Sequence, residues 1–167
     1  MTITTAFCNS FKAVVMVMAP HTAADTYKLV LIKSGHAGTS GASTTAVGTP
    51  GSGSPSASNL GTDAVATSGT YASVDGVALS GFSASLDTST GILTFTDPSA
   101  FTSATLSADG CIIYNSSRSN KACAVYSFGG TVSSTAASFD VNLPAAAAAT
   151  ALMRQRRRLG GPYHRGG

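Results

Sequence analysis

From residue 62 onward, the chain is a series of short apolar or β-branched runs separated by residues that favour turns. This pattern predicts antiparallel strands with short connections, packed as a sandwich or a barrel. We predict strands at 70–79, 82–86, 92–96, 103–107, 111–115, 122–128, 138–143 and 150–154. We predict turns at Asp75-Gly76, Thr90-Gly91, Asp97-Pro98, Asp109-Gly110, Gly129-Gly130 and Pro144, and a hairpin loop at 115–120.

The composition supports a mostly β fold. Charged residues make up 10% of the 167 residues, against about 25% in a typical domain, and the chain has no Glu. The exposed faces of a helical bundle or a coiled coil need Glu, Lys and Arg, so these classes are disfavoured. Classical disorder is disfavoured as well, because 43% of the residues are hydrophobic. We expect one β-rich domain over residues 1–154 and a basic tail over 155–167.

Two elements are predicted before the strand series. Residues 2–19 place Phe7, Phe11 and Met18 on one helical stripe, and Pro20 ends the segment, so we predict an α-helix that packs on a sheet. The run 13–18 is β-branched enough for its second half to form a strand instead. Tyr27–Lys33 is apolar on both faces and is predicted to be a central strand.

Residues 34–62 have a different composition. They contain seven glycines, Pro50 and Pro55, many Ser and Thr, and few side chains that could form a core. This composition predicts a long loop or an extended arm. A functional loop is one explanation. An arm that only a neighbouring subunit orders is the other, and we favour it.

The positive charge is concentrated at the C-terminal end. Residues 1–153 carry four Lys and one Arg against seven Asp, whereas residues 154–167 carry five Arg and no acid. A body with so few charges suits a protein whose surfaces end up against other subunits. The arginines indicate either an anionic partner or a solvated terminal segment. Tyr163 is the only aromatic residue among them, so stacking on single-stranded nucleic acid is not supported.

The sequence carries no recognisable catalytic or metal-binding set. The histidines lie in predicted loops or in the tail, and three of the aspartates mark predicted turns. The cysteines fit no zinc spacing, and we expect Cys8, Cys111 and Cys123 to be buried free thiols. We therefore expect no enzyme activity, no catalytic or metal-ligating residues and no cofactor.

Neither membrane insertion nor secretion is indicated. The longest apolar stretch, 13–20, is too short to cross a bilayer, and the opening residues lack the basic region of a signal peptide. We expect synthesis in a cytoplasm.

Four segments together resemble a family of small tailed-bacteriophage virion proteins. They are TITTAFCNSFK at 2–12, YKLVLIK at 27–33, the pair ADGCIIYNSS at 108–117 and KACAVYSFGG at 121–130, and SFDVNLP at 138–144 with ALMR at 151–154. The resemblance hardly touches residues 34–62. Family members tend to have a Trp before the strand that follows Phe101 here, and they usually end soon after the last strand, so the arginine-rich tail is a departure.

The resemblance implies a structural role in the virion, as a head decoration or cement protein. We expect an antiparallel β-sandwich, with a jelly roll as one form of it, carrying the N-terminal helix, the arm and the tail. Copies would associate as dimers or trimers on the capsid exterior and bind the major capsid protein. The residues we assign to intersubunit contacts are Pro50, Pro55, Arg154, Arg156, Arg157, Arg158, Tyr163 and Arg165.

Two other functions stay open. One is a component of the phage tail or fibre, which differs from a shell protein in copy number. The other is nucleic-acid binding through the arginine-rich tail, which we consider less favoured because the basic side chains of an extended segment would point both ways.

Overall fold

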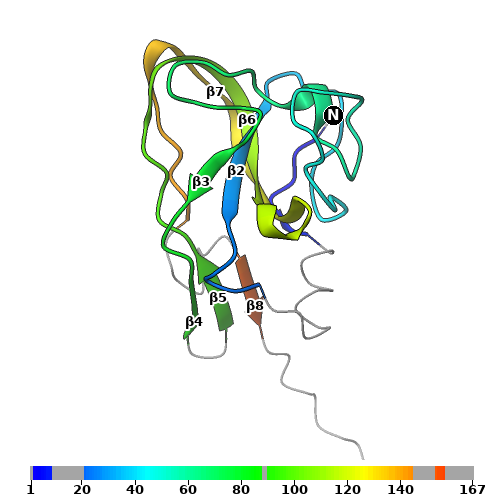
Figure 1. Ribbon diagram of the computed structural model, residues 1–167, viewed down its shortest axis with the longest axis vertical. Helices are drawn as coiled ribbons and strands as arrows, with labels where there is room; N and C mark the ends of the chain where they lie inside the picture. The colour runs from blue at the N-terminus through cyan, green and yellow to red at the C-terminus, as the bar shows by residue number, and fades with distance from the viewer. Residues whose placement is uncertain (1, 9–20, 88–89, 145–152, 157–167) are drawn as a thin grey trace, which may run out of the picture.

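The structure is a computed structural model that describes residues 2–8, 21–87, 90–144 and 153–156. Within these ranges the protein is mostly β, as predicted, and consists of two antiparallel sheets (Figure 1). The larger sheet has the strand order β1-β7-β6-β2-β3, and the smaller has the order β4-β5-β8. The only helical segments in the described residues are two short 3₁₀ turns, η1 (Gly61–Asp63) and η2 (Ser116–Arg118), and no helix there is long enough to span a membrane.

Two long strands dominate the larger sheet. β6 (Phe101–Asn115) and β7 (Lys121–Phe139) form one antiparallel ribbon, where the sequence predicted four shorter strands. The predicted hairpin loop at 115–120 is confirmed. Ser119 and Asn120 both adopt left-handed backbone conformations there, and such conformations allow the chain to reverse within a few residues.

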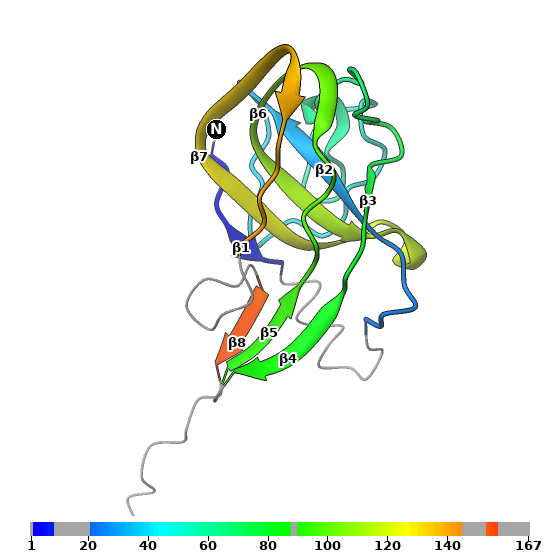
Figure 2. The same ribbon diagram turned by 90° about the vertical axis from the view of Figure 1, so that its left-hand side faces the viewer.

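The predicted turns at Asp109-Gly110 and Gly129-Gly130 are wrong, because both pairs lie inside the long strands. Ala108 pairs with Val132 and Gly110 pairs with Ser127, so Asp109 alone faces residues 128–131. This is a large β-bulge, and it bends the whole ribbon. Figure 2 shows β6 and β7 rising together, turning over and descending again. The turn-favouring residues therefore mark a bend in a ribbon and not the ends of strands.

The core is built around β2 (Tyr27–Lys33), which has the predicted bounds. Leu29, Val30, Leu31 and Ile32 are completely buried, as expected for a strand with neighbours on both sides and cover on both faces. β2 pairs with β6 along its length and with β3 (Val77–Leu79) at its beginning.

The strand predicted at 70–79 is shorter than expected, since only Val77–Leu79 forms it. Residues 68–71 instead make a tight turn beside β6, where the backbone N–H of Thr70 donates to the carbonyl of Thr102. Tyr71 is fully buried in this turn. Its hydroxyl accepts a hydrogen bond from the N–H of Leu31, and its ring lies 5.1 Å from that of Phe101. Tyr71 thereby connects the central strand to the folded-over end of the ribbon.

The N-terminal helix is not supported. Residues 2–8 are extended: Ile3 forms a bridge with Ser40, and β1 (Ala6–Phe7) pairs with Ala124 and Val125 of β7. The opening residues are rich in Thr and Ile, which favour strands, and β7 offers them an edge. The rest of the predicted helix, residues 9–20, lies outside the described residues.

Residues 34–62 contain no strand, as predicted, but their own chain orders them. Val47 and Leu60 are buried, and the N–H of Leu60 donates to the carbonyl of Val47. The segment is also tied to β7, because the N–H of Val47 donates to the carbonyl of Asn120 and that of Ala122 to Thr45. In this structure the segment packs on its own domain as a loop.

The smaller sheet consists of β4 (Ser83–Asp87), β5 (Thr90–Thr94) and β8 (Met153–Arg156). These strands lie close to the predicted 82–86, 92–96 and 150–154, of which 150–152 are outside the described residues. The sheet lies at one end of the larger one (Figure 2). Three aromatic rings connect the two sheets: Tyr27 stacks on Phe82 at 4.9 Å and contacts Phe95 at 5.1 Å.

Candidate functional site

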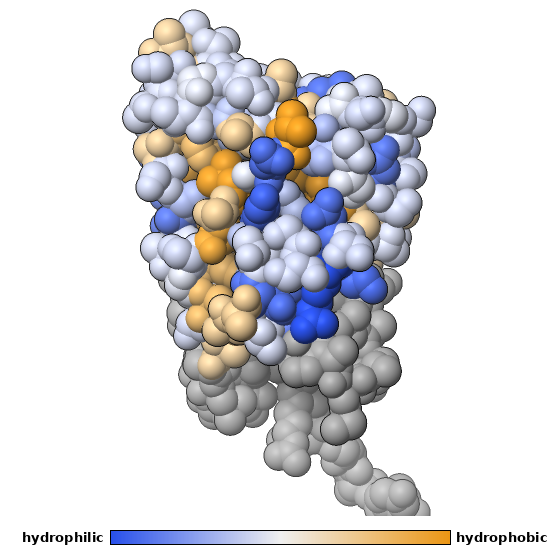
Figure 3. Space-filling model, in the orientation of Figure 1, coloured by the Kyte–Doolittle hydropathy of each residue, from blue (hydrophilic) through white to orange (hydrophobic). Residues whose placement is uncertain are grey.

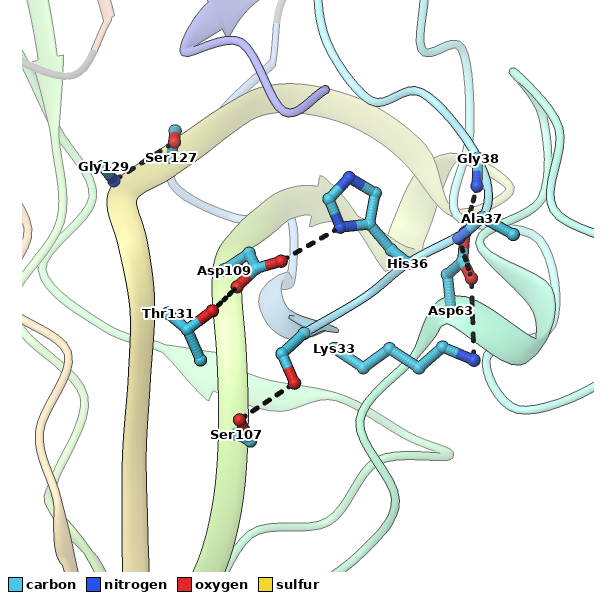
Figure 4. A network of polar contacts seen from close by, with 11 residues as sticks. Lys33, His36, Ala37, Gly38, Asp63, Ser107, Asp109, Ser127, Gly129 and Thr131 are labelled. Atoms are coloured by element: carbon cyan, nitrogen blue, oxygen red, sulfur yellow. Dashed lines mark hydrogen bonds and ion pairs between the residues drawn. The ribbon is translucent and has the colours of Figure 1, made fainter. Parts of the chain in front are cut away.

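The bend of the ribbon carries a polar network centred on Asp109. One carboxylate oxygen lies 3.3 Å from Nδ1 of His36, in the loop after β2, and the other accepts a hydrogen bond of 2.5 Å from the hydroxyl of Thr131 (Figure 4). Three separate segments thus meet at one side chain. The carboxylate accepts from the hydroxyl and lies beside the imidazole, so it joins the loop after β2 to both strands of the ribbon. The arrangement fits a role in holding the bulge in place.

A second acidic side chain fixes the start of the 34–62 loop. Asp63 in η1 is buried and accepts hydrogen bonds from the backbone N–H groups of Ala37 at 2.9 Å and Gly38 at 2.7 Å (Figure 4). Lys33 forms an ion pair with it at 3.7 Å. The carboxylate thereby ties residues 37 and 38 to η1 and acts as a clamp on the loop.

A third cluster lies beside the 115–120 hairpin. Asp25 accepts hydrogen bonds from Nε of Arg118 at 2.9 Å, from Nδ2 of the buried Asn115 at 3.0 Å and from the N–H of Thr22. Burial by itself would raise the pKa of Asp25, but these hydrogen bonds outweigh it and lower the pKa. Burial, followed by the charge of Arg118, lowers the pKa of His21.

The buried thiols and phenols are poor nucleophiles. Cys8, Cys111 and Cys123 are fully buried thiols outside any disulfide, as predicted. Burial raises the pKa values of Cys111 and Cys123 far above the ordinary thiol range, and it also raises those of Tyr27, Tyr71 and Tyr114. A thiol reacts as its thiolate, so these cysteines remain unreactive in the folded domain. No group of three His, Cys or Asp side chains in the described ranges is placed to hold a metal ion.

A hollow in the described surface gathers aromatic, apolar and acidic side chains. A hollow of about 200 Å³ lies between β7 and the segment that follows it, and it is lined by Tyr126, Phe128, Val132, Asp140, Val141 and Asn142. The rings of Tyr126 and Phe128 meet edge to face at 5.8 Å. We call this feature the β7 hollow.

The rest of the visible surface shows no broad apolar area. In Figure 3, apolar residues form a narrow and broken band beside a strongly polar area. The large hydrophobic side chains that are exposed among the described residues are Val74, at 66%, and Val132, at 43%. Val132 lines the β7 hollow, so the hollow contains an exposed hydrophobic side chain.

The structure describes only four of the eight predicted contact residues. Pro50 is buried and Pro55 is half-buried, so Pro50 presents little surface to a partner. Arg154 and Arg156 belong to β8, whereas Arg157, Arg158, Tyr163 and Arg165 lie outside the described residues. The sequence reasoning missed the β7 hollow because its residues come from two stretches that only the bend of the ribbon brings together.

Comparison with known proteins adds no relative. No family model, no curated protein and no solved structure matches this chain.

Proposed function

We propose that this protein is a structural component of a bacteriophage virion that decorates the capsid exterior and stabilises contacts between major capsid subunits. In this role it acts without catalysis or a cofactor, and copies associate as dimers or trimers. The proposal is supported by the sequence resemblance, by the low charge of the domain and by the surface chemistry of the folded-over end of the β6–β7 ribbon.

The surface chemistry of the outer part of β7, residues 129–138, carries the proposal. Residues 129–138 are exposed, apart from the half-buried Ser134, and none of them is charged. They are Gly, Thr, Ser, Ala and Val, which have short side chains. Ordering such side chains at an interface costs little entropy, whereas a Lys or Arg loses up to about 2 kcal/mol. A rigid surface of this kind suits repeated contacts on a symmetric shell.

The same strand is protected against uncontrolled pairing. Besides the bulge opposite Asp109, residues 135 and 136 together face Thr105, and Ala136 adopts a left-handed conformation. Bulges twist an edge strand away from the flat geometry that another strand needs. We therefore infer that the outer part of β7 binds its partner through side chains and not by strand addition.

The finer description of the fold belongs to the same proposal. The ribbon folds over the core (Figure 2), and Tyr71 bridges β2 and the beginning of β6. These features support a sandwich-like arrangement of two layers, of which a jelly roll is a special case.

The direct test is the composition of purified phage particles. We expect a band for this protein on a denaturing gel, with a copy number comparable to that of the major capsid protein. Shells that lack the protein should bind it when it is added back and should then resist heating better. Its absence from intact particles would refute the proposal, and a copy number of a few per particle would favour a tail or fibre component instead.

A second test separates the shell from nucleic acid as the partner. Binding to DNA through the arginine-rich tail predicts an affinity that falls steeply with salt concentration. Binding to empty shells that persists without nucleic acid supports decoration, whereas salt-sensitive binding to DNA with no binding to shells would support the alternative.

A further inference from the structure

The β7 hollow combines aromatic, apolar and acidic groups. Tyr126 and Phe128 form its aromatic wall, and the ring of Phe128 also lies 6.4 Å from that of the buried Phe139, which fixes the wall to the core. Val141 is 3% exposed and provides an apolar floor. The carboxylate of Asp140 is exposed and accepts a hydrogen bond from the hydroxyl of Ser138 at 3.2 Å.

These groups match the chemistry of an arginine side chain. A guanidinium group is planar and permanently charged, packs against aromatic rings and donates hydrogen bonds to a carboxylate. Its apolar stem can lie on an apolar floor such as Val141. A second carboxylate, Asp97, accepts a hydrogen bond from the N–H of Leu143, the residue after Asn142, and adds negative charge on this side.

The chain itself supplies the complementary ligand. Residues 154–167 carry five arginines and no acid, whereas the preceding 153 residues carry two more acidic than basic groups. β8 ends at Arg156, and the strand points away from the larger sheet (Figure 2), which favours another molecule as the receptor.

We propose that the β7 hollow binds an arginine side chain from the C-terminal segment 154–167 of a second copy of this protein. Aromatic packing and the ion pair with Asp140 hold the guanidinium, and reciprocal exchange of two segments joins two copies. The inference rests on the proposed function, in which copies associate as dimers or trimers, and names the contact that joins them, which forms in solution without a shell.

A charge exchange tests this contact in the full-length protein. We expect sedimentation velocity to show association of the wild type that weakens with increasing salt. Asp140→Lys alone and the double change Arg157→Glu with Arg158→Glu alone should each weaken association by about tenfold or more. A mixture of the two variants should restore it, because the unchanged arginines of one copy then meet Asp140 of the other, and the introduced glutamates meet the introduced lysine.

The matched control is Asp75→Lys, which makes the same change of charge at an exposed turn residue far along the chain from the hollow. It should associate like the wild type. Asp140→Asn, which preserves shape, provides a second variant if Asp140→Lys lowers the melting temperature.

Three results would overturn the inference: a wild type that stays monomeric at all concentrations, a mixture that does not recover, or an equal loss with Asp75→Lys. None of them bears on whether the protein is found in particles, so failure of this contact and failure of the capsid role are distinguishable.

Discussion

At the scale of single residues, Asp63 shows how a short polar contact orders a long loop. Its buried carboxylate accepts two backbone N–H groups from residues 37 and 38, and a Cβ on Gly38 would lie only 2.9 Å from Cβ of Pro55. The loop therefore closes on itself at this point. Removing the carboxylate would leave two donors with no partner in a tightly packed place.

We expect Asp63→Ala to lower the free energy of unfolding by about 2–4 kcal/mol, because each unsatisfied buried donor costs about 1–3 kcal/mol. Lys33→Ala is the matched control. Its ion pair with Asp63 is long, at 3.7 Å, and the lysine side chain is 39% exposed, so the loss should stay below about 1 kcal/mol. Urea denaturation measures the free energy of unfolding of both variants. Equal losses would contradict the role of Asp63 as a clamp on the loop.

His21 should make the stability of the protein depend on pH. Its pKa in the folded state lies below 6.5, so the unfolded chain binds more protons as the pH falls. The contribution of neutral His21 is complete above about pH 6.5 and is lost as the pH drops below that value. His21→Gln should flatten the profile of melting temperature between about pH 7.5 and pH 5.5. An unchanged slope would show that other titrating groups cause the dependence of the melting temperature on pH.

Asp25 should affect the stability of the protein at lower pH than His21 does. Its folded pKa is depressed below 3.8, so its contribution is present above that value and is lost as the pH falls through the folded pKa. Asp25→Asn should therefore remove part of the acid sensitivity below about pH 4 without altering the slope near neutrality. Thermal melts at closely spaced pH values separate the two residues.

At the scale of elements, the bend of the β6–β7 ribbon depends on close approach of the backbones. A Cβ on Gly110 would lie 2.5 Å from the carbonyl oxygen of Tyr126 in the paired strand and 3.3 Å from Ile3. A backbone carbonyl cannot move aside as a flexible side chain can. The glycine is thus required for space at this position, next to the residue that holds the bulge.

We expect Gly110→Ala to destabilise the protein by about 1–3 kcal/mol through overpacking. Gly130→Ala, in the same bend, is the control, because a Cβ there meets nothing within 4 Å and the backbone is not left-handed. Its stability should be unchanged or higher by up to about 1 kcal/mol. Chemical denaturation of both variants provides the comparison, and similar losses would show that the bend tolerates no substitution at all.

At the scale of the whole molecule, the three cysteines report on the integrity of the fold. Cys8 precedes the undescribed N-terminal segment, whereas Cys111 and Cys123 lie in the two strands of the ribbon, and all three are fully inaccessible. A thiol reagent at about pH 8 should modify the native protein at least about a hundredfold more slowly than the protein in guanidinium chloride. Fast modification of one cysteine in the native state would show that its element opens locally.

Much of the element-level description was predictable. The strand Tyr27–Lys33, the hairpin at 115–120, the strands near 82–86 and 92–96 and the buried thiols follow from local composition, because β-branched runs and turn residues act over a few neighbours. The lengths of β6 and β7 did not follow. Asp109-Gly110 and Gly129-Gly130 favour turns locally, but Gly110 pairs with Ser127 and Asp109 faces residues 128–131, so both pairs lie inside a ribbon that continues to pair.

The sequence by itself determined the β class, the order of most strands and the separation of a nearly neutral body from an arginine-rich end, because these depend on residue type and on neighbours in the chain. Only the tertiary structure decided that residues 2–8 join a sheet edge, that residues 34–62 pack on their own domain and that residues 126–132 and 140–142 form one hollow. Each of these depends on pairing between distant segments, and a local pattern holds no information about which distant edge or surface is available.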